Sequence, residues 1–184
     1  MRTLSRNVLR LSASSLFRKT FWWCRVPSVH RQTLVDLVNS HNTWTCGAEL
    51  GCDKGILTGM LLRQCPSLQH LTVVDTFPDM HRSRRVFEMA DEMRGRLHIT
   101  HSTTSEASIL VANGALDFVF IDADHGYEAV RDDIANWRDR VRPGGWLGGH
   151  DYHPRKFPGV VKAVDEAFGK TVHHLPGTIW GVWC

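Results

Sequence analysis

The chain has 184 residues, 42% hydrophobic and 22% charged, which is enough apolar sequence for one globular core. Its net charge of +3 is unevenly distributed. Residues 1–35 carry seven basic and no acidic side chains, whereas residues 36–184 carry 15 basic and 19 acidic ones. This mildly acidic body argues against a nucleic-acid partner, because phosphate recognition needs clustered positive charge. No apolar run reaches the length of a membrane span, so we expect no transmembrane segment.

The basic N-terminal stretch has two interpretations. It combines Arg, Ser and Leu without acids, as mitochondrial presequences do, and several of its apolar residues would form a stripe, namely Leu4, Val8, Leu11, Phe17 and Phe21. The alternative is an extra basic helix on a cytoplasmic domain. We therefore predict a leader or extra helix over residues 1–26 and one domain over residues 27–184. The expected location is cytoplasmic, or the mitochondrial matrix if the leader is a presequence. Five cysteines without a C-x-x-C pair favour a reducing compartment.

Strand-like apolar runs alternate with helical patterns along the rest of the chain. In chain order, the predicted elements are helix His30–Ser40, strand Trp44–Leu50, helix Lys54–Gln64, strand Leu71–Asp75, helix Ser83–Met93, strand Leu97–Thr100, helix Glu106–Ala112, strand Leu116–Asp122, helix Tyr127–Val141, strand Trp146–Gly149, helix Gly159–Phe168 and a hairpin of Thr171–Leu175 with Thr178–Trp183. This order predicts an α/β fold with a doubly wound, mostly parallel seven-stranded sheet, helices on both faces and a C-terminal antiparallel hairpin.

Polar residues or glycines end five consecutive predicted strands. They are Glu49 to Gly51, Asp75, His101 and Ser102, Asp122, and His150 with Asp151. In an open sheet, the ligand lies outside the carboxyl ends of the strands. We therefore expect these residues to outline one cleft.

A glycine loop follows the first strand and indicates a nucleotide cofactor. Gly55 would let a helix N-terminus approach a ligand, and Asp75 follows it by twenty residues, at the distance where such folds bind a ribose hydroxyl. A dinucleotide loop needs a middle glycine, which is missing between Gly51 and Gly55. Glu49, two residues before Gly51, instead favours a cationic or amine-bearing ligand.

Four motifs in this order resemble a class I S-adenosylmethionine-dependent methyltransferase. They are Glu49–Gly51 with Gly55 and Thr58, then Asp75, then Asp117–Glu128, and finally Arg142–Gly145 with Gly149–Tyr152. The similarity runs from about Pro27 to the C-terminus. It is closest to the small O-methyltransferase branch that contains antibiotic-sugar enzymes, and more distant to the catechol and caffeoyl-CoA O-methyltransferases. The resemblance implies a Rossmann-like enzyme, dimeric in some relatives, that transfers a methyl group from S-adenosylmethionine to an oxygen of a small sugar-like or phenolic acceptor.

The resemblance also implies which residues bind the cofactor, namely Glu49, Gly51, Gly55, Thr58, Asp75, Ser102, Asp122 and His125. Asp75 would accept both ribose hydroxyls, and Ser102 would line the adenine side. Structural alternatives stay open for three of these residues. Glu49 would otherwise be a solvated acid at a strand end, and Asp75 or His125 a helix cap.

Asp122, His150 and Asp151 are the catalytic residues that the resemblance implies. Asp122 ends the most apolar strand, where an ionised carboxylate is costly unless it is paired or bound to a cation. In metal-dependent relatives, the matching acid binds Mg²⁺ together with the residues that stand here as His150 and Asp151. Mg²⁺ prefers oxygen, so Asp122 and Asp151 fit as metal ligands and His150 does not. His150 is then a general base, or points elsewhere, or belongs to a site for a softer ion such as manganese or iron.

Other functions remain open from the sequence. They are methylation of nitrogen or of a protein side chain, a nucleotide-dependent oxidoreductase, and a non-catalytic cofactor-binding or interaction module. The segment Tyr152–Pro158 is either an acceptor-facing loop or an ordinary turn. The sequence does not identify the acceptor.

Overall fold

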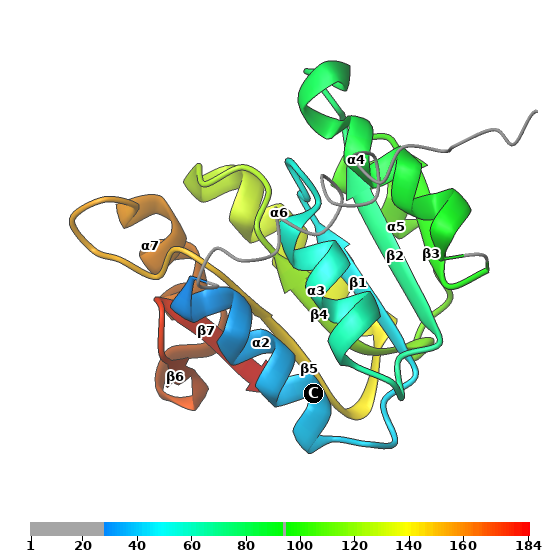
Figure 1. Cartoon of the computed structure of the whole chain (residues 1–184). Coiled ribbons are helices and arrows are strands. Elements are labelled where there is room, and N and C mark those ends of the chain that lie inside the picture. Colours follow the sequence, from blue (N-terminus) through cyan, green and yellow to red (C-terminus); the bar gives the residue numbers. More distant parts are fainter. Residues whose placement is uncertain (1–27, 94) are drawn as a thin grey trace, which may run out of the picture.

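Continuous apolar runs form the central strands of one sheet in the computed structural model, which describes residues 28–93 and 95–184 (Figure 1). The strand order is β3-β2-β1-β4-β5-β7-β6. The strands are β1 (Cys46–Leu50), β2 (His70–Asp75), β3 (Leu97–His101), β4 (Leu116–Ile121), β5 (Val141–Gly149), β6 (His173–Leu175) and β7 (Ile179–Trp183). Strands β1 to β5 pair in parallel, and β7 pairs antiparallel with β5 and β6. The predicted sheet architecture is confirmed.

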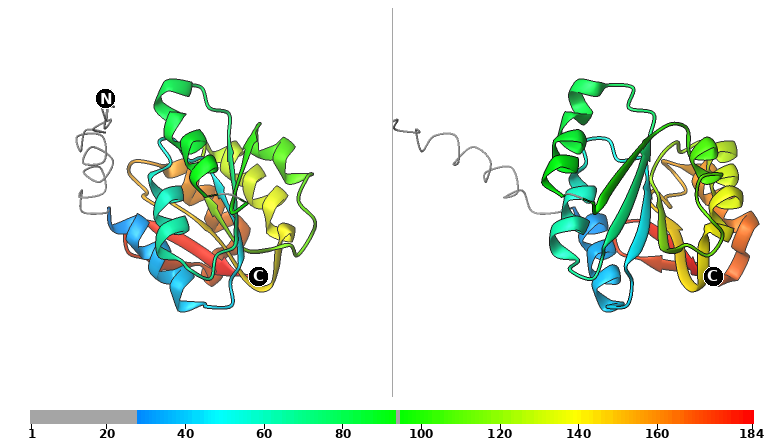
Figure 2. Two further views of the ribbon diagram at one scale, coloured as in Figure 1. Left: turned by 45° about the vertical axis from the view of Figure 1, so that its right-hand side comes forward. Right: turned by 90° about the vertical axis from the view of Figure 1, so that its right-hand side faces the viewer.

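Helices cover both faces of the sheet (Figure 2). They are α2 (Val29–Ser40), α3 (Ile56–Gln64) and α4 (Met80–Glu92) on one face, and α5 (Thr104–Ser108), α6 (Tyr127–Trp137) and α7 (Pro158–Phe168) on the other, with short 3₁₀ helices η2 (Arg138–Arg140) and η3 (Gly169–Thr171). Alternate residues of β4 belong to different cores, because Phe118 packs with Leu61 of α3, and Val119 with Ile134 of α6. All six residues of β4 are buried, as expected for a central parallel strand.

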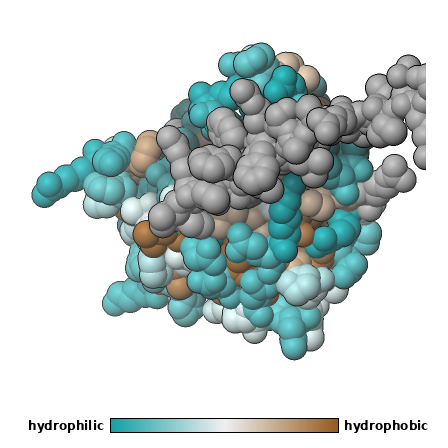
Figure 3. Space-filling view, in the orientation of Figure 1, coloured by the Kyte–Doolittle hydropathy of each residue, from teal (hydrophilic) through white to brown (hydrophobic). Residues whose placement is uncertain are grey.

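Hydrophilic residues predominate on the described part of the face shown in Figure 3. The large exposed hydrophobic residues are few, among them Val29, Met80, Ile109 and Leu110. None of the helices in the described part of the chain has the length and apolar character that a bilayer crossing requires. The predicted leader or extra helix over residues 1–26 lies outside the described residues.

The predicted helix Tyr127–Val141 is too long, because the chain leaves the helix before Val141. Helix α6 ends at Trp137, and β5 begins at Val141 and contains Pro143. An ion pair with the buried Asp117 holds this start of the strand, since Arg142 Nε donates to Asp117 Oδ1 at 2.6 Å. Asp117 Oδ2 also accepts from the backbone N–H groups of Thr45 and Cys46. Pro143 is tolerated because the pairing register shifts between Leu116 and Phe118.

The predicted helix Glu106–Ala112 is misplaced. Helix α5 spans Thr104–Ser108 because Thr103 and Glu106 form a capping box that starts the helix earlier. Similarly, Asp79 caps α4 by accepting from Arg82 N–H, so α4 begins at Met80 rather than Ser83. The predicted strand Trp146–Gly149 starts five residues too late, because β5 begins at Val141. The remaining predicted boundaries differ from those observed by at most two residues.

Candidate functional site

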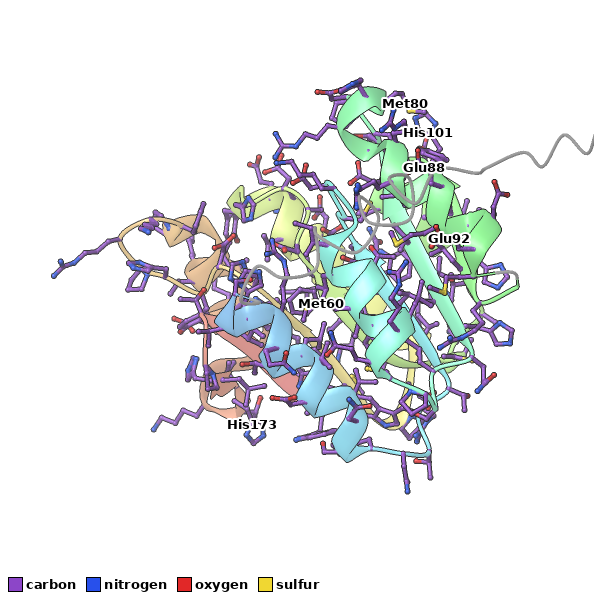
Figure 4. The ribbon with its side chains drawn as sticks, viewed as in Figure 1. Met60, Met80, Glu88, Glu92, His101 and His173 are labelled. Carbon is purple, nitrogen blue, oxygen red and sulfur yellow. The ribbon has the colours of Figure 1, made fainter. Side chains whose placement is uncertain are left out.

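One cavity of about 950 Å³ lies outside the carboxyl ends of the parallel strands. Its volume is in the range of small-molecule binding sites. All five predicted strand ends contribute to its lining, with Glu49, Asp75, Ser102, Asp122 and Asp151. In Figure 4, Met80 and His101 are labelled near one end of the molecule, and His173 of β6 is labelled near the other end. Met80 and His101 are the sequence neighbours of Asp79 and Ser102, which line the cavity. The expected single cleft is therefore present.

The glycine loop packs tightly between β1 and the residues after β4. Gly51 has a φ angle of +81°, and a Cβ atom at this position would collide with the Asp122 carbonyl oxygen. Gly55, with φ of +67°, is the N-cap of α3, and its N–H donates to the Cys52 carbonyl oxygen at 2.7 Å. Gly51 is therefore needed both for its positive φ angle and because a side chain would not fit there. Gly55 is needed mainly for its positive φ angle. Gly51 lines the cavity, whereas Gly55 shapes the loop from behind.

Asp75 organises this loop through its carboxylate. Its Oδ2 accepts from the N–H groups of Cys52 at 2.9 Å and Asp53 at 3.2 Å, and its Oδ1 accepts from Phe77 N–H at 2.7 Å. The main chain thus fixes the orientation of an acid that lines the cavity. Oδ1 accepts only one of these bonds and therefore keeps a further lone pair for a ligand.

Glu49 is a buried acid on the cavity wall, with 1% of its surface exposed. Thr58 Oγ1 donates to Glu49 Oε2 at 2.6 Å. Burial raises the pKa of Glu49 to about 8, against the opposing effects of the Thr58 hydrogen bond and of Arg31. Thr58, which we expected to bind the cofactor, is fully buried and does not line the cavity. Its hydroxyl contacts Glu49, which does line the cavity.

At the opposite end of the cavity, two aspartates and two histidines form one cluster. His125 Nε2 lies 2.6 Å from Asp151 Oδ2 and 3.7 Å from Asp122 Oδ1. His150 Nδ1 lies 3.2 Å from Asp151 Oδ1 and 3.6 Å from Asp122 Oδ1. The structure therefore brings together the three predicted catalytic residues and adds His125, which we had expected at the cofactor.

The charged residues of this cluster shift one another's pKa values. Burial alone would raise the pKa of Asp122, but His125 and His150 outweigh it and hold that pKa below its usual range. The Asp122 carboxylate raises the pKa of His125. For His150, burial favours the neutral ring, yet Asp122 and Asp151 outweigh it and raise the pKa.

Aromatic neighbours hold both histidine rings. His150 Nε2 is 3.2 Å from Thr178 Oγ1, and its ring packs against His30 with centroids 4.0 Å apart. The ring of His125 stacks on Phe157 at 4.7 Å. Burial lowers the pKa of His30 to about 4, with a further contribution from His150, so His30 is neutral at pH 7.

The cluster fits a divalent cation. Asp122, His125 and Asp151 each offer one ligand atom, and these atoms lie within 4.8 Å of one another. His125 Nε2 is buried and has no hydrogen-bond partner among the described residues, although Asp151 is close. Either a proton on this nitrogen or a bound cation would compensate the two neighbouring carboxylates. The predicted ligands Asp122 and Asp151 are two of these three residues, and their role as metal ligands stays a prediction.

Three residues of the site gave no signal in the sequence. Arg31 lines the cavity, and its Nη1 donates to Ser28 Oγ at 2.9 Å. In the sequence it was one of seven cations within residues 1–35. His30 and Thr178 contact His150 from α2 and from the β6–β7 turn. Of the predicted acceptor loop, neither Arg155 nor Lys156 lines the cavity, and both are exposed.

Comparisons with known proteins identify a family and similar folds. A family model described as a methyltransferase domain matches residues 48–152. No curated protein matches the sequence at a significant level. Among solved structures, an O-methyltransferase from Bacillus cereus in complex with SAH has a TM-score of 0.65 at 17% identity, covering 96% of this chain and 94% of its own.

Two further structures are similar. A TDP-rhamnose 3′-O-methyltransferase of calicheamicin biosynthesis has a TM-score of 0.69 at 14% identity, with 95% of this chain and 87% of that chain covered. A Burkholderia thailandensis 1,6-didemethyltoxoflavin N1-methyltransferase, solved with S-adenosylhomocysteine, has a TM-score of 0.58 at 14% identity, with 92% and 82% covered. These structures share the fold, and the family model covers more than half of the sequence. The chain therefore belongs to the methyltransferase domain family, as the order of its motifs predicted.

Proposed function

We propose that this protein transfers a methyl group from S-adenosylmethionine to an oxygen of a small-molecule acceptor. One observation carries the proposal. A single cavity joins the Glu49–Gly51 and Asp75 end, suited to the cofactor, to the Asp122 and Asp151 end, suited to the acceptor. The O-methyltransferases among the similar structures support oxygen as the target, whereas the N1-methyltransferase makes nitrogen the second candidate.

The charge of the cavity suits this cofactor. Nine carboxylic acids line it, against three basic side chains, Arg31, Lys54 and Arg82, and one of these, Arg82, is paired with Asp53. S-adenosylmethionine carries a sulfonium and an ammonium group, and acids stabilise both. We assign the ammonium to Glu49, the ribose hydroxyls to Asp75, and the adenine side to Ser102. Gly51 and Gly55 shape the loop, and Thr58 supports Glu49.

We assign the carboxylate of the methionine portion to Arg31. This carboxylate is the only anionic group of S-adenosylmethionine, so it needs a cation in a cavity lined mainly by acids. Arg31 lines the cavity and is close enough to Glu49 to oppose the rise in its pKa. A guanidinium offers two parallel N–H donors to a carboxylate.

Transfer occurs by in-line displacement. The acceptor oxygen forms a bond to the methyl carbon, the carbon–sulfur bond breaks, and the sulfur keeps the electron pair, which gives S-adenosylhomocysteine. Such a reaction depends mainly on aligning donor and acceptor and excluding water. A divalent ion bound at Asp122 and Asp151 would lower the pKa of an acceptor hydroxyl.

The acceptor proton has a route within the cluster. Asp151 lines the large cavity, whereas His150 does not and stands behind it. We assign the first proton transfer to Asp151 and the final proton site to His150 Nδ1, 3.2 Å from Asp151 Oδ1. This keeps the base role predicted for His150 but routes it through Asp151.

Two measurements test this function. Calorimetric titration of the full chain with S-adenosylhomocysteine is expected to show micromolar binding. Incubation with S-adenosylmethionine and a panel of phenols, sugars and amines is then expected to yield S-adenosylhomocysteine and a product methylated on oxygen, identified by mass spectrometry. No binding by a folded sample contradicts the assignment. A product methylated only on nitrogen selects the second candidate.

A further inference from the structure

We propose that His125, rather than His150, supplies the nitrogen ligand of a cation site with Asp122 and Asp151, and that this site selects a first-row transition-metal ion over Mg²⁺. The inference rests on the proposed function only for the role of the ion beside the acceptor oxygen. The site itself is argued from the contacts of these side chains.

The geometry around His125 carries the inference. Its Nε2 is buried, lacks a hydrogen-bond partner among the described residues, and lies 2.6 Å from Asp151 Oδ2. Phe157 stacks on the ring and keeps this nitrogen directed at the two carboxylates. Asp122 and Asp151 together balance the charge of a divalent ion.

His150 is engaged differently, although it touches the same acids. Its Nε2 is 3.2 Å from the Thr178 hydroxyl, and its ring packs against His30. Its Nδ1 lies 3.2 Å from Asp151 Oδ1, which is not the oxygen that faces His125. After it takes up the acceptor proton on Nδ1, His150 can donate to the carboxylates from behind. His150 therefore contacts Asp122 and Asp151 without being a ligand of the ion, as a group that orients metal ligands does.

The donor set decides which ion is favoured. Mg²⁺ prefers octahedral sites made of oxygen atoms and keeps several of its waters. An imidazole nitrogen instead favours ions such as Mn²⁺, Fe²⁺, Co²⁺ and Zn²⁺, with affinity generally rising along that series. With one nitrogen and two carboxylates from the chain, this site belongs to the second class.

Metal binding to the full chain, without any acceptor, tests the inference. The protein is stripped with a chelator, dialysed and titrated with Co²⁺, whose visible absorption reports its coordination. Mg²⁺ is titrated by calorimetry and as a competitor. We expect one Co²⁺ per chain and an affinity for Mg²⁺ weaker by about 100-fold, the order of magnitude for a site containing imidazole.

Matched variants separate the two histidines. His125→Ala is expected to weaken Co²⁺ binding by about 10- to 100-fold and to change the Co²⁺ spectrum. His125→Asp creates an all-oxygen set and should narrow the difference between Co²⁺ and Mg²⁺. His150→Gln keeps the three ligands and should retain the Co²⁺ spectrum, with a smaller loss of affinity than in His125→Ala. Thermal unfolding checks that each variant is folded. If His125→Ala does not fold, the test rests on the preference of the wild type for Co²⁺ over Mg²⁺ and on the result for His125→Asp.

Several results would overturn the inference. They are equal affinity of the wild type for Mg²⁺ and Co²⁺, no Co²⁺ binding at millimolar concentration, and loss of the site in His150→Gln but not in His125→Ala. A parallel titration with S-adenosylhomocysteine keeps the two proposals distinct. Co²⁺ binding without S-adenosylhomocysteine binding would contradict the proposed function and support the metal site. S-adenosylhomocysteine binding without Co²⁺ binding would contradict the metal site and leave the proposed function standing.

Discussion

The two ends of the cavity are held in place by different means. At the end that we propose for the cofactor, the cofactor end, backbone N–H groups of Cys52, Asp53 and Phe77 fix the carboxylate of Asp75. At the end that we propose for the acceptor, the acceptor end, Asp122 and Asp151 are held by side chains, chiefly the rings of His125 and His150. The first arrangement follows from the path of the chain, and the second depends on several side chains keeping their protonation states.

This difference has a functional consequence. A ligand held by a rigid loop loses affinity when one contact is removed, while the chemistry of the other end stays intact. A cluster of mutually dependent groups loses its chemistry when one member is removed. We therefore expect changes at the cofactor end to affect binding and changes at the acceptor end to affect turnover.

The largest expected effect is that of Asp122→Ala. Removing this carboxylate leaves Asp151 as the only acid that contacts both histidines, so turnover should fall by about 10²- to 10³-fold. The affinity for S-adenosylhomocysteine should stay within about threefold, because the loop around Gly51 and Asp75 is intact. Initial rates and calorimetry check the two quantities. A large loss of affinity would instead place Asp122 at the cofactor.

Asp75→Ala should show the opposite pattern. Lost hydrogen bonds to a charged group cost about 1.5–3 kcal/mol, so S-adenosylhomocysteine affinity should fall by about 10- to 150-fold. Asp53→Ala is the matched control, since the Asp53 side chain instead pairs with the exposed Arg82. Calorimetry measures both variants, and thermal unfolding shows whether the loop survives. Equal effects of the two substitutions would contradict the ribose assignment.

Arg31→Met tests whether Arg31 binds the amino-acid portion of the cofactor rather than its nucleoside portion. We expect about tenfold weaker binding of S-adenosylhomocysteine, the scale of one charge-assisted contact. Binding of 5′-methylthioadenosine, which lacks the amino-acid portion, should not change. Arg31→Lys keeps the charge and should recover part of the affinity. If both ligands weaken equally, Arg31 supports the cavity wall rather than binding the carboxylate.

The smallest expected effect is a pH dependence of stability that comes from Glu49. Burial raises its pKa from 4.5 to about 8 in the folded chain, so between these values the folded state binds more protons than the unfolded state. Stability of the ligand-free protein should therefore fall as pH rises through this window, by up to about 1 kcal/mol per pH unit. Glu49→Gln should flatten that slope, as measured by urea unfolding from pH 5 to pH 8.

Binding offers an independent check on Glu49. An ammonium group beside this acid favours the carboxylate form, so S-adenosylhomocysteine should release protons near pH 7. Calorimetry in buffers of different ionisation enthalpy detects this release, and Glu49→Gln should reduce it. An unchanged proton count in the variant would separate Glu49 from the ammonium group.

Local patterns in the sequence determined most of the architecture. Apolar runs and their breaks predicted seven strands and six helices, because burial between two helical layers requires them. The order of the motifs also predicted the methyltransferase family and the five strand ends that line the cavity. Errors arose where one distant contact decides a boundary. Arg142 pairs with Asp117, and this contact places it in β5. The residue pattern around residues 138–142 gives no sign of the contact.

Tertiary structure alone decided how the residues of the site divide their roles. Thr58 lies behind Glu49 because α3 packs against β1, and Arg31 enters the cavity wall because α2 covers the same face. Thr178 reaches His150 from a turn 28 residues away. A sequence lists which groups are available at strand ends. Which nitrogen faces which carboxylate depends on packing between segments that are distant along the chain, and this packing separates His125 from His150.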